Sequence, residues 1–117
     1  MKARIYHNPR CSKSRQAKLL LQSSGMDLEI VEYLTNPPTK KELDKICRML
    51  GVEPQDILRI KEKRFSELGL SKDDQRKRKD WIALMVSNPI LIERPIVIFQ
   101  GKAVIGRPPE VVLEIFH

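Results

Sequence analysis

Cys11 is the residue of this sequence best suited to covalent chemistry. It lies where a strand-like segment passes through a loop into a helix, in a turn crowded by His7, Arg10, Lys13 and Arg15. Backbone N–H groups and the positive dipole end at a helix start lower the pKa of a thiol, and neighbouring cations act in the same direction. The pattern predicts a reactive thiolate. A small buried cysteine that merely begins the helix is the alternative, and the charged neighbours on both sides disfavour it.

The sequence offers Cys11 no cysteine close by. Ser14 stands where a CxxC protein carries its second thiol, so any disulfide of Cys11 must join another molecule or the remote Cys47. Cys47 shares an apolar helical stripe with Leu43 and Leu50, which predicts a buried core residue. The site is therefore expected to be monothiol.

Three arginines that are far apart in the sequence stand in unusual surroundings. Arg59 follows an apolar pair, Arg94 precedes a proline at the entry to a strand, and Arg107 lies between a glycine and a proline. A guanidinium stays charged and offers paired donors to an oxyanion or a carboxylate. Either these side chains bind an anion together with the N–H groups of the Cys11 turn, or each is a surface arginine with a buried stem.

Hydrophobic periodicity and turn residues predict both strands and helices along one domain, residues 1–117. Strand, helix and strand open the chain, which implies a parallel pair with a right-handed crossover. A helical block with a capping box at Thr39 and Glu42 follows, and a hairpin and a last helix complete an α/β fold with a mixed sheet and a helical insertion between the second and third strands. The expected strands are 3–7, 28–34, 96–99 and 103–105, and the later expected helices include 54–60, 81–86 and 110–116.

The charge balance of the chain is basic. Lys and Arg number 22 against 15 Asp and Glu, a formal net charge of +7, part of which lies in the run 76–79. This balance favours anionic partners, but such a run is also typical of a solvated helix face, and few aromatics accompany it, so nucleic acid is not expected. Two histidines and two cysteines disfavour a metal centre. No apolar run suits a membrane span or a signal peptide, so we expect a cytoplasmic protein.

Five segments of the chain, taken in order, resemble one known family. The first, residues 7–15 with the sequence HNPRCSKSR, resembles the active-site segment of the glutaredoxin-coupled arsenate reductases, the ArsC family. The later ones are residues 33–38, 57–59, 88–97 and 106–112. Because these blocks reach nearly the whole chain, the resemblance implies a thioredoxin-like fold that contains the helical insertion.

The resemblance also implies a role for each site residue. Cys11 is expected to attack arsenate, with His7 and Ser14 helping to keep its thiol ionised, and Pro95 corresponds to the cis-proline of the fold. Glutathione then attacks the thiol–arsenate adduct, arsenite leaves, and glutaredoxin reduces the mixed disulfide, with no cofactor bound. The residues that correspond to the oxyanion ligands of the family are Arg59, Arg94 and Arg107.

Two features bring the chain closer to a short branch of this family. Ser12 and Lys13 stand where the well-known resistance enzymes carry Gly-Thr, and the sequence ends at His117 without a longer tail. Two alternatives remain open: a glutathione-dependent thiol oxidoreductase with another substrate, and an Spx-type transcriptional regulator that binds RNA polymerase. Spx proteins carry CxxC at the redox turn, which Ser14 does not match. We expect the protein to be a monomer. Its expected partners are arsenate or a similar oxyanion, glutathione and glutaredoxin.

Overall fold

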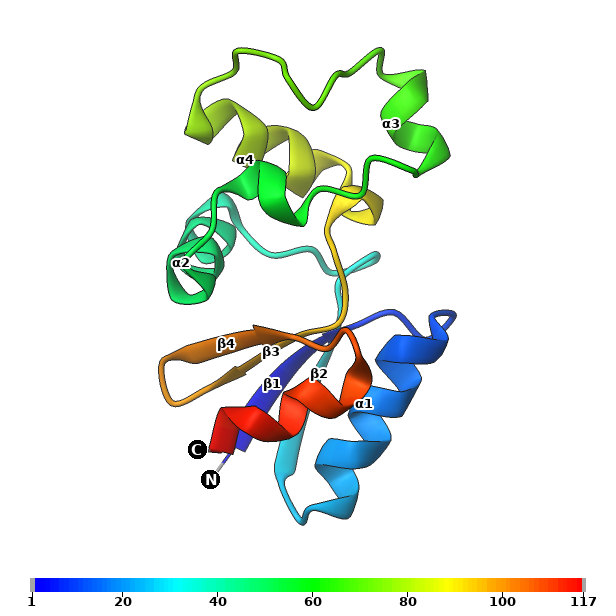
Figure 1. Ribbon diagram of the computed structural model, residues 1–117, viewed down its shortest axis with the longest axis vertical. Coiled ribbons are helices and arrows are strands. Elements are labelled where there is room, and N and C mark those ends of the chain that lie inside the picture. Colours follow the sequence, from blue (N-terminus) through cyan, green and yellow to red (C-terminus); the bar gives the residue numbers. More distant parts are fainter. Residues whose placement is uncertain (1, 117) are drawn as a thin grey trace. The chain divides into compact units, whose positions relative to one another are not determined.

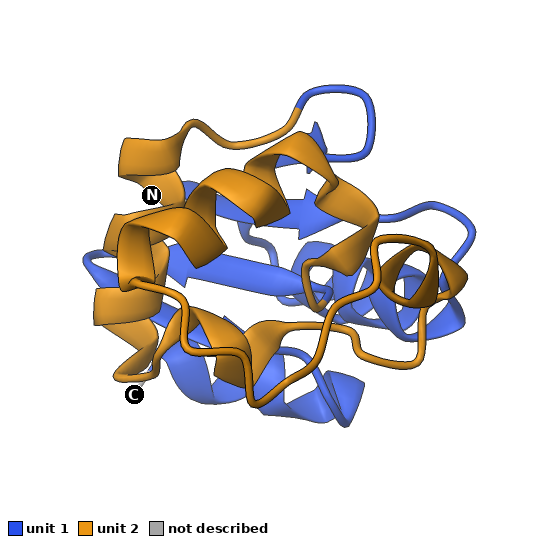
Figure 2. Ribbon diagram, turned by 90° about the horizontal axis from the view of Figure 1, so that it is seen from above, with its two compact units in different colours: residues 1–36, 94–117 blue, residues 37–93 orange. Residues whose placement is uncertain are grey.

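The computed structural model describes residues 2–116, which divide into two compact units (Figure 2). Unit 1 combines the segment up to Asn36 with the segment from Arg94 onward, and unit 2 is Pro37–Glu93. In chain order the elements are β1 (Lys2–His7), α1 (Ser12–Ser23), β2 (Asp27–Glu32), α2 (Lys40–Leu50), η1 (Pro54–Ile57), α3 (Lys63–Glu67), α4 (Arg78–Ser87), η2 (Pro89–Leu91), β3 (Ile96–Phe99), β4 (Lys102–Ile105) and η3 (Pro109–Phe116), where η marks a 3-10 helix (Figure 1).

The frame of unit 1 is a four-stranded sheet in the order β2-β1-β3-β4 (Figure 1). β1 and β2 run parallel, with α1 as the crossover between them, whereas β3 lies antiparallel to both β1 and β4. All of unit 2 is inserted between β2 and β3. The mixed sheet and the helical insertion between the second and third strands are therefore confirmed.

Two strand ends differ from the sequence-based expectation because turns hold them. β2 ends at Glu32 instead of continuing to residue 34, since the N–H groups of Thr35 and Asn36 both turn back to the Glu32 carbonyl. In the hairpin, Gln100 and Gly101 take positive φ values of 49° and 76°. This pair of left-handed residues makes a two-residue turn, so β4 begins one residue earlier than expected.

The core of unit 1 lies between the sheet and the helices α1 and η3, which also pack against each other. The apolar residues that α1 turns toward the sheet follow helical spacing, and the strands supply every second residue. Phe99 and Phe116 close this core with an edge-to-face contact at 5.5 Å between ring centroids. The fully or almost fully buried members are Ala3, Ile5, Ala17, Leu21, Val97, Phe99, Val112 and Ile115.

Unit 2 is helical, and its first helix follows the predicted signals. The Thr39 side chain accepts the N–H of Glu42 at 3.1 Å while the Glu42 carboxylate accepts the N–H of Thr39 at 2.9 Å, so the predicted capping box at the start of α2 is confirmed. α2 ends at Gly51, which takes a left-handed φ of 70°. α4 is longer than the predicted 81–86 segment, and the short helix α3 lies in a stretch for which we predicted no helix.

The helix predicted at 54–60 ends early. η1 stops at Ile57 because Leu58 forms an antiparallel bridge with Ile92, and the N–H of Glu93 donates to the Ile57 carbonyl. Leu58 is therefore extended, and turns follow it. Over the described residues 2–116, no helix combines the length and apolar character that crossing a membrane requires.

At Gly106, which follows β4, residues of α1, of η3 and of the segment before β3 lie very close to the backbone. A Cβ atom at this position would lie 2.8 Å from Pro95 Cγ, 2.9 Å from Val112 Cγ1 and 3.4 Å from Ala17 Cβ. The two shorter distances are below any ordinary carbon–carbon contact, so only glycine fits without movement of its neighbours.

We predict that Gly106→Ala lowers the free energy of unfolding by about 1–3 kcal/mol, because an added methyl group overpacks this junction. Urea denaturation followed by circular dichroism measures the change. Glu114→Ala, at an exposed position of η3 in the same unit, is the matched control and should stay close to native. Equal midpoints for the two variants would contradict the prediction.

Candidate functional site

Chain segments that are distant in sequence meet at one edge of the unit 1 sheet. β1 leads into the thiol turn at its carboxyl end, where Tyr6 pairs with Ile96, the first residue of β3. Because β3 runs antiparallel to β1, Arg94 enters the sheet at this same end. Ile96 also pairs with Ile105, the last residue of β4, so Arg107 leaves the sheet there as well. The topology alone therefore gathers the thiol and two of the three predicted arginines.

The Arg107 guanidinium joins the Cys11 sulfur to the start of β3. Its Nη2 lies 3.8 Å from Cys11 Sγ, and its Nε donates to the backbone oxygen of Arg94 at 2.9 Å. The peptide bond between Arg94 and Pro95 is cis, which confirms that prediction, and the bond between Arg107 and Pro108 is cis as well. Cys11, Arg94 and Arg107 thus lie together within unit 1.

The environment of Cys11 favours its thiolate. Cys11 is only 9% exposed, and this burial by itself would raise the pKa of its thiol. The backbone N–H of Ser14, the Arg94 guanidinium, the backbone N–H of Lys13 and the Arg107 guanidinium together outweigh burial and hold the pKa below its ordinary value. The site therefore combines a buried nucleophile with donors and cations that also suit an approaching oxyanion.

His7 and Ser14 form a buried pair behind the thiol turn. His7 Nδ1 and Ser14 Oγ are hydrogen-bonded at 2.6 Å, and Ser14 Oγ also accepts the N–H of Asn8 at 3.0 Å. Burial lowers the pKa of His7, and the positive charges of Lys18 and Arg15 lower it further against the opposing charge of Glu32, so the ring is neutral at pH 7. The structure brings both predicted residues to the turn, where they contact the loop; their catalytic role stays a prediction.

Arg59 belongs to unit 2, so its convergence on Cys11 stays a prediction. Within its own unit the side chain is well held. Its Nη2 forms an ion pair with Glu62 Oε2 at 2.7 Å, and its Nη1 donates to the Ile90 carbonyl at 3.2 Å. The guanidinium is therefore held on the irregular segment that follows η1, instead of lying on a helix as expected.

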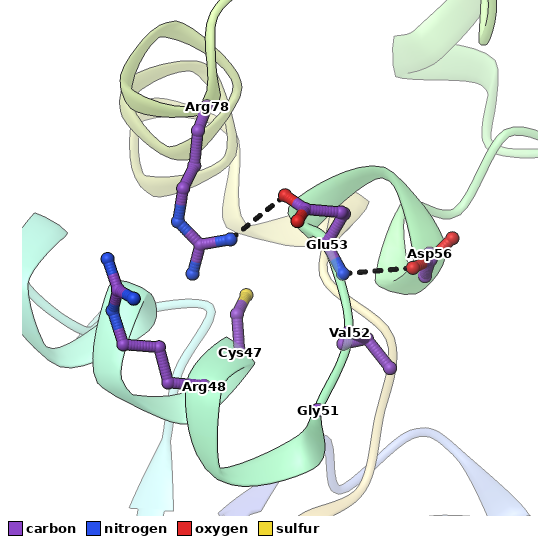
Figure 3. A pocket seen from close by; sticks show the side chains of 7 residues that line it. All are labelled: Cys47, Arg48, Gly51, Val52, Glu53, Asp56 and Arg78. Carbon is purple, nitrogen blue, oxygen red and sulfur yellow. Dashed lines mark hydrogen bonds and ion pairs between the residues drawn. The ribbon is translucent and has the colours of Figure 1, made fainter.

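Cys47 is confirmed as a core residue. It is fully buried beside a cavity of about 450 Å³ in unit 2, where Arg78 donates to Glu53 at 3.0 Å (Figure 3). Burial raises the pKa of the Cys47 thiol to about 11, although the charge of Arg78 opposes that rise. Because Arg78 is also paired with Asp44 at 2.8 Å, its charge is taken up within unit 2. The thiol stays protonated at neutral pH.

The two arginines of the basic run 76–79 contact other residues of unit 2. Arg76 lies over the Trp81 ring at 5.6 Å and 3.5 Å from Asp74 Oδ2, and Arg78 has the ion pairs described above. These contacts favour the interpretation of the run as a solvated helix end. Across residues 2–116, three or more His, Cys, Asp or Glu side chains nowhere gather in a way that could hold a metal ion.

Two residues of the turn have contacts that the sequence analysis overlooked. Asn8 is buried and hydrogen-bonds the loop with both its backbone and its side chain. Arg15 Nη1 donates to the Pro9 carbonyl at 2.8 Å. An asparagine before a proline is a turn signal that could have identified Asn8, whereas nothing in the sequence distinguishes Arg15 from the other cations of the turn.

We predict that Cys11 is alkylated by iodoacetamide with a pH midpoint below the value of about 8.5 for a free cysteine, while native Cys47 stays unreactive. The thiolate form of Cys11 is favoured by its surroundings, and that of Cys47 is disfavoured by burial. Mass spectrometry of peptides after timed alkylation measures both sites, with the denatured protein as the control that exposes Cys47. Equal reactivity of the two native thiols would refute this.

We also predict that the stability of the protein falls as the pH decreases through the ordinary pKa of histidine, about 6.5. Below this pH the unfolded chain takes up a proton at His7 that the folded protein does not bind, because folding lowers the pKa of His7. Urea unfolding between about pH 7.5 and about pH 5.5 measures the slope. His7→Gln should show a flatter slope, because this variant lacks the group whose pKa folding lowers; parallel slopes would count against a neutral buried His7.

Comparisons with known proteins extend over nearly the whole chain. Residues 6–115 match the model of the ArsC family. The uncharacterized protein YfgD of Escherichia coli K12 is 47% identical over 113 residues, which cover 96% of this chain and 94% of that one. An arsenate reductase of Neisseria meningitidis serogroup A is 43% identical over 109 residues, 92% of each chain.

A solved structure matches equally well. The arsenate reductase from Vibrio cholerae superposes with a TM-score of 0.92 at 44% sequence identity and covers 98% of both chains. This match confirms the expected thioredoxin-like fold with its helical insertion. Since the family model and its relatives cover both the thiol turn and the segments that carry the arginines, the chain belongs to the ArsC family.

Proposed function

We propose that this protein is an arsenate reductase in which the Cys11 thiolate attacks arsenate. The observation that carries the proposal is the contact between the Arg107 guanidinium and the Cys11 sulfur, with Arg94 acting on the same thiol. The named activity of the Neisseria meningitidis and Vibrio cholerae relatives supports it.

In the first step the Cys11 sulfur forms a bond to arsenic(V), and one arsenate hydroxyl group takes up a proton from solvent and leaves as water. Two negative charges at about 4 Å repel each other by about 1 kcal/mol in water and by about 4 kcal/mol at the lower effective dielectric of a protein surface. Arg94 and Arg107 offset this repulsion and stabilise the oxygen charge that grows in the transition state. Arg59 is proposed as a third oxyanion ligand on the family resemblance alone.

In the second step the thiolate of glutathione attacks Cys11 Sγ. A disulfide bond forms, the sulfur–arsenic bond breaks, and its electron pair stays on arsenic, which leaves as arsenite in the trivalent state. Glutaredoxin then takes the glutathione from Cys11 by thiol–disulfide exchange and restores the thiolate. Ser14 agrees with this external route, because the turn has no second thiol that could resolve the adduct. Because these reductants are cytoplasmic, we propose that the protein is cytoplasmic. We also propose that it is a monomer.

The two alternatives share the thiol but differ in its partner. A glutathione-dependent oxidoreductase on another substrate would need a reactive Cys11 without oxyanion turnover. An Spx-type regulator would bind RNA polymerase and would not need the guanidinium at the sulfur. The Arg107 contact therefore favours thiol chemistry over the regulator, and the named activity of the relatives favours arsenate as the substrate.

We predict that purified protein produces arsenite from arsenate with glutathione and glutaredoxin, and that Cys11→Ser abolishes this activity. Arg107→Lys keeps the net charge but removes the paired donors, so its turnover should fall by about a hundredfold. Arg94→Lys and Arg59→Lys should also lose activity.

The matched control is Arg4→Lys, because Arg4 lies in the same unit but is ion-paired with Glu29 at 2.8 Å. It should reduce arsenate at nearly the native rate. Arsenite formed over time is the measurement. An inactive native protein with an alkylatable Cys11 would favour another thiol substrate, and capture of RNA polymerase by that protein would favour the regulator.

A further inference from the structure

Asn8 is the first residue of the loop that leads from β1 to the thiol. It is 9% exposed, and only two other polar residues of the described chain, His7 and Ser14, are comparably buried. A polar side chain in such a position needs hydrogen-bond partners, and its partners show what it holds in place. The partners of Asn8 all belong to the turn around Cys11.

Three hydrogen bonds of Asn8 reach three different points of that turn. Its N–H donates to Ser14 Oγ at 3.0 Å, its carbonyl accepts the N–H of Cys11 at 3.0 Å, and its side-chain Oδ1 accepts the N–H of Arg10 at 3.0 Å. The first two use the backbone, and any residue could supply them. The third uses the side chain and needs a side-chain acceptor at this position.

The side-chain bond fixes the part of the loop around Pro9, which the backbone of Pro9 cannot do. Pro9 has no N–H and a fixed φ, so the first amide after Asn8 that can be tied is that of Arg10. A short Asx side chain reaches the N–H two residues ahead, and Asn does so without a charge. Aspartate at this position would place a negative charge beside a thiolate and an incoming oxyanion.

We propose that Asn8 is a positioning residue for Cys11. The side-chain amide of Asn8 holds the loop so that the N–H groups of Lys13 and Ser14 face the sulfur. The proposal rests on the proposed function only in taking Cys11 as the reacting thiol. Asn8 touches neither the sulfur nor a substrate in this scheme, since its contacts are with the loop. Its effect passes through the orientation of the Cys11 turn, on which the thiolate-favouring donors depend.

The test is the pH dependence of Cys11 alkylation by iodoacetamide in native protein and in Asn8→Ala. Loss of the side-chain bond frees the Arg10 N–H and loosens the turn. The midpoint should rise by about one pH unit, the change expected when one backbone N–H of Lys13 or Ser14 no longer donates to the thiolate. Asn8→Ser can make a weaker version of the same bond and should give a smaller rise.

Asn88→Ala is the matched control. Asn88 also uses both ends of its amide, accepting from Arg64 Nε at 2.9 Å and donating to the Leu84 carbonyl at 2.9 Å, but it belongs to unit 2. This variant should lose stability and keep the native alkylation midpoint, which separates positioning from a general loss of stability.

A native midpoint in folded Asn8→Ala would overturn the proposal, and so would an equal rise in Asn88→Ala. If Asn8→Ala does not fold, the midpoint of Asn8→Ser decides the question in the same way. Alkylation involves no arsenate, so failure of the arsenate assay leaves the proposal for Asn8 intact. Conversely, an unchanged midpoint leaves arsenate reduction standing and removes only the role of Asn8.

Discussion

The site depends on stabilising one negative charge that is largely withdrawn from water. A buried thiolate is unfavourable unless hydrogen bonds and opposite charges replace its hydration. Around Cys11 this replacement comes from two sources: backbone N–H groups at the start of α1, and the guanidinium groups of Arg94 and Arg107. Cys47, which is buried without such compensation, has a pKa of about 11. The contrast between the two cysteines shows that placement, and not residue type, produces the reactive thiol.

The sheet topology supplies the compensation. The parallel crossover from β1 through α1 leaves the helix start at the carboxyl end of β1. The antiparallel strands β3 and β4 then begin and end at this same edge, so Arg94, two residues before β3, and Arg107, two residues after β4, reach the thiol. Gly106 permits the close approach of these segments, because its neighbours leave no space for a Cβ atom. The clustering of guanidinium groups at the thiol therefore follows from strand direction as much as from the arginines themselves.

The net charge of +7 describes this protein poorly when it is taken as a single number. Arg76 and Arg78 interact with Trp81, Asp74, Asp44 and Glu53 inside unit 2, and Arg4 is paired with Glu29 in the sheet. The cations that matter for chemistry are the few whose guanidinium groups act on the sulfur. Composition could not separate these two groups, since both are arginines in a basic chain.

The sequence by itself determined the elements and the identity of the thiol. Local signals are sufficient for the Thr39 capping box and the stripe that buries Cys47, because both depend on spacing along one helix. The end of η1 at Ile57 and the position of Arg59 outside a helix could not be predicted, because a bridge to Ile92 decides them. Likewise, only the tertiary structure shows that Arg107 contacts the Cys11 sulfur. Contacts between residues distant in sequence depend on how strands pair, and no local pattern records that pairing.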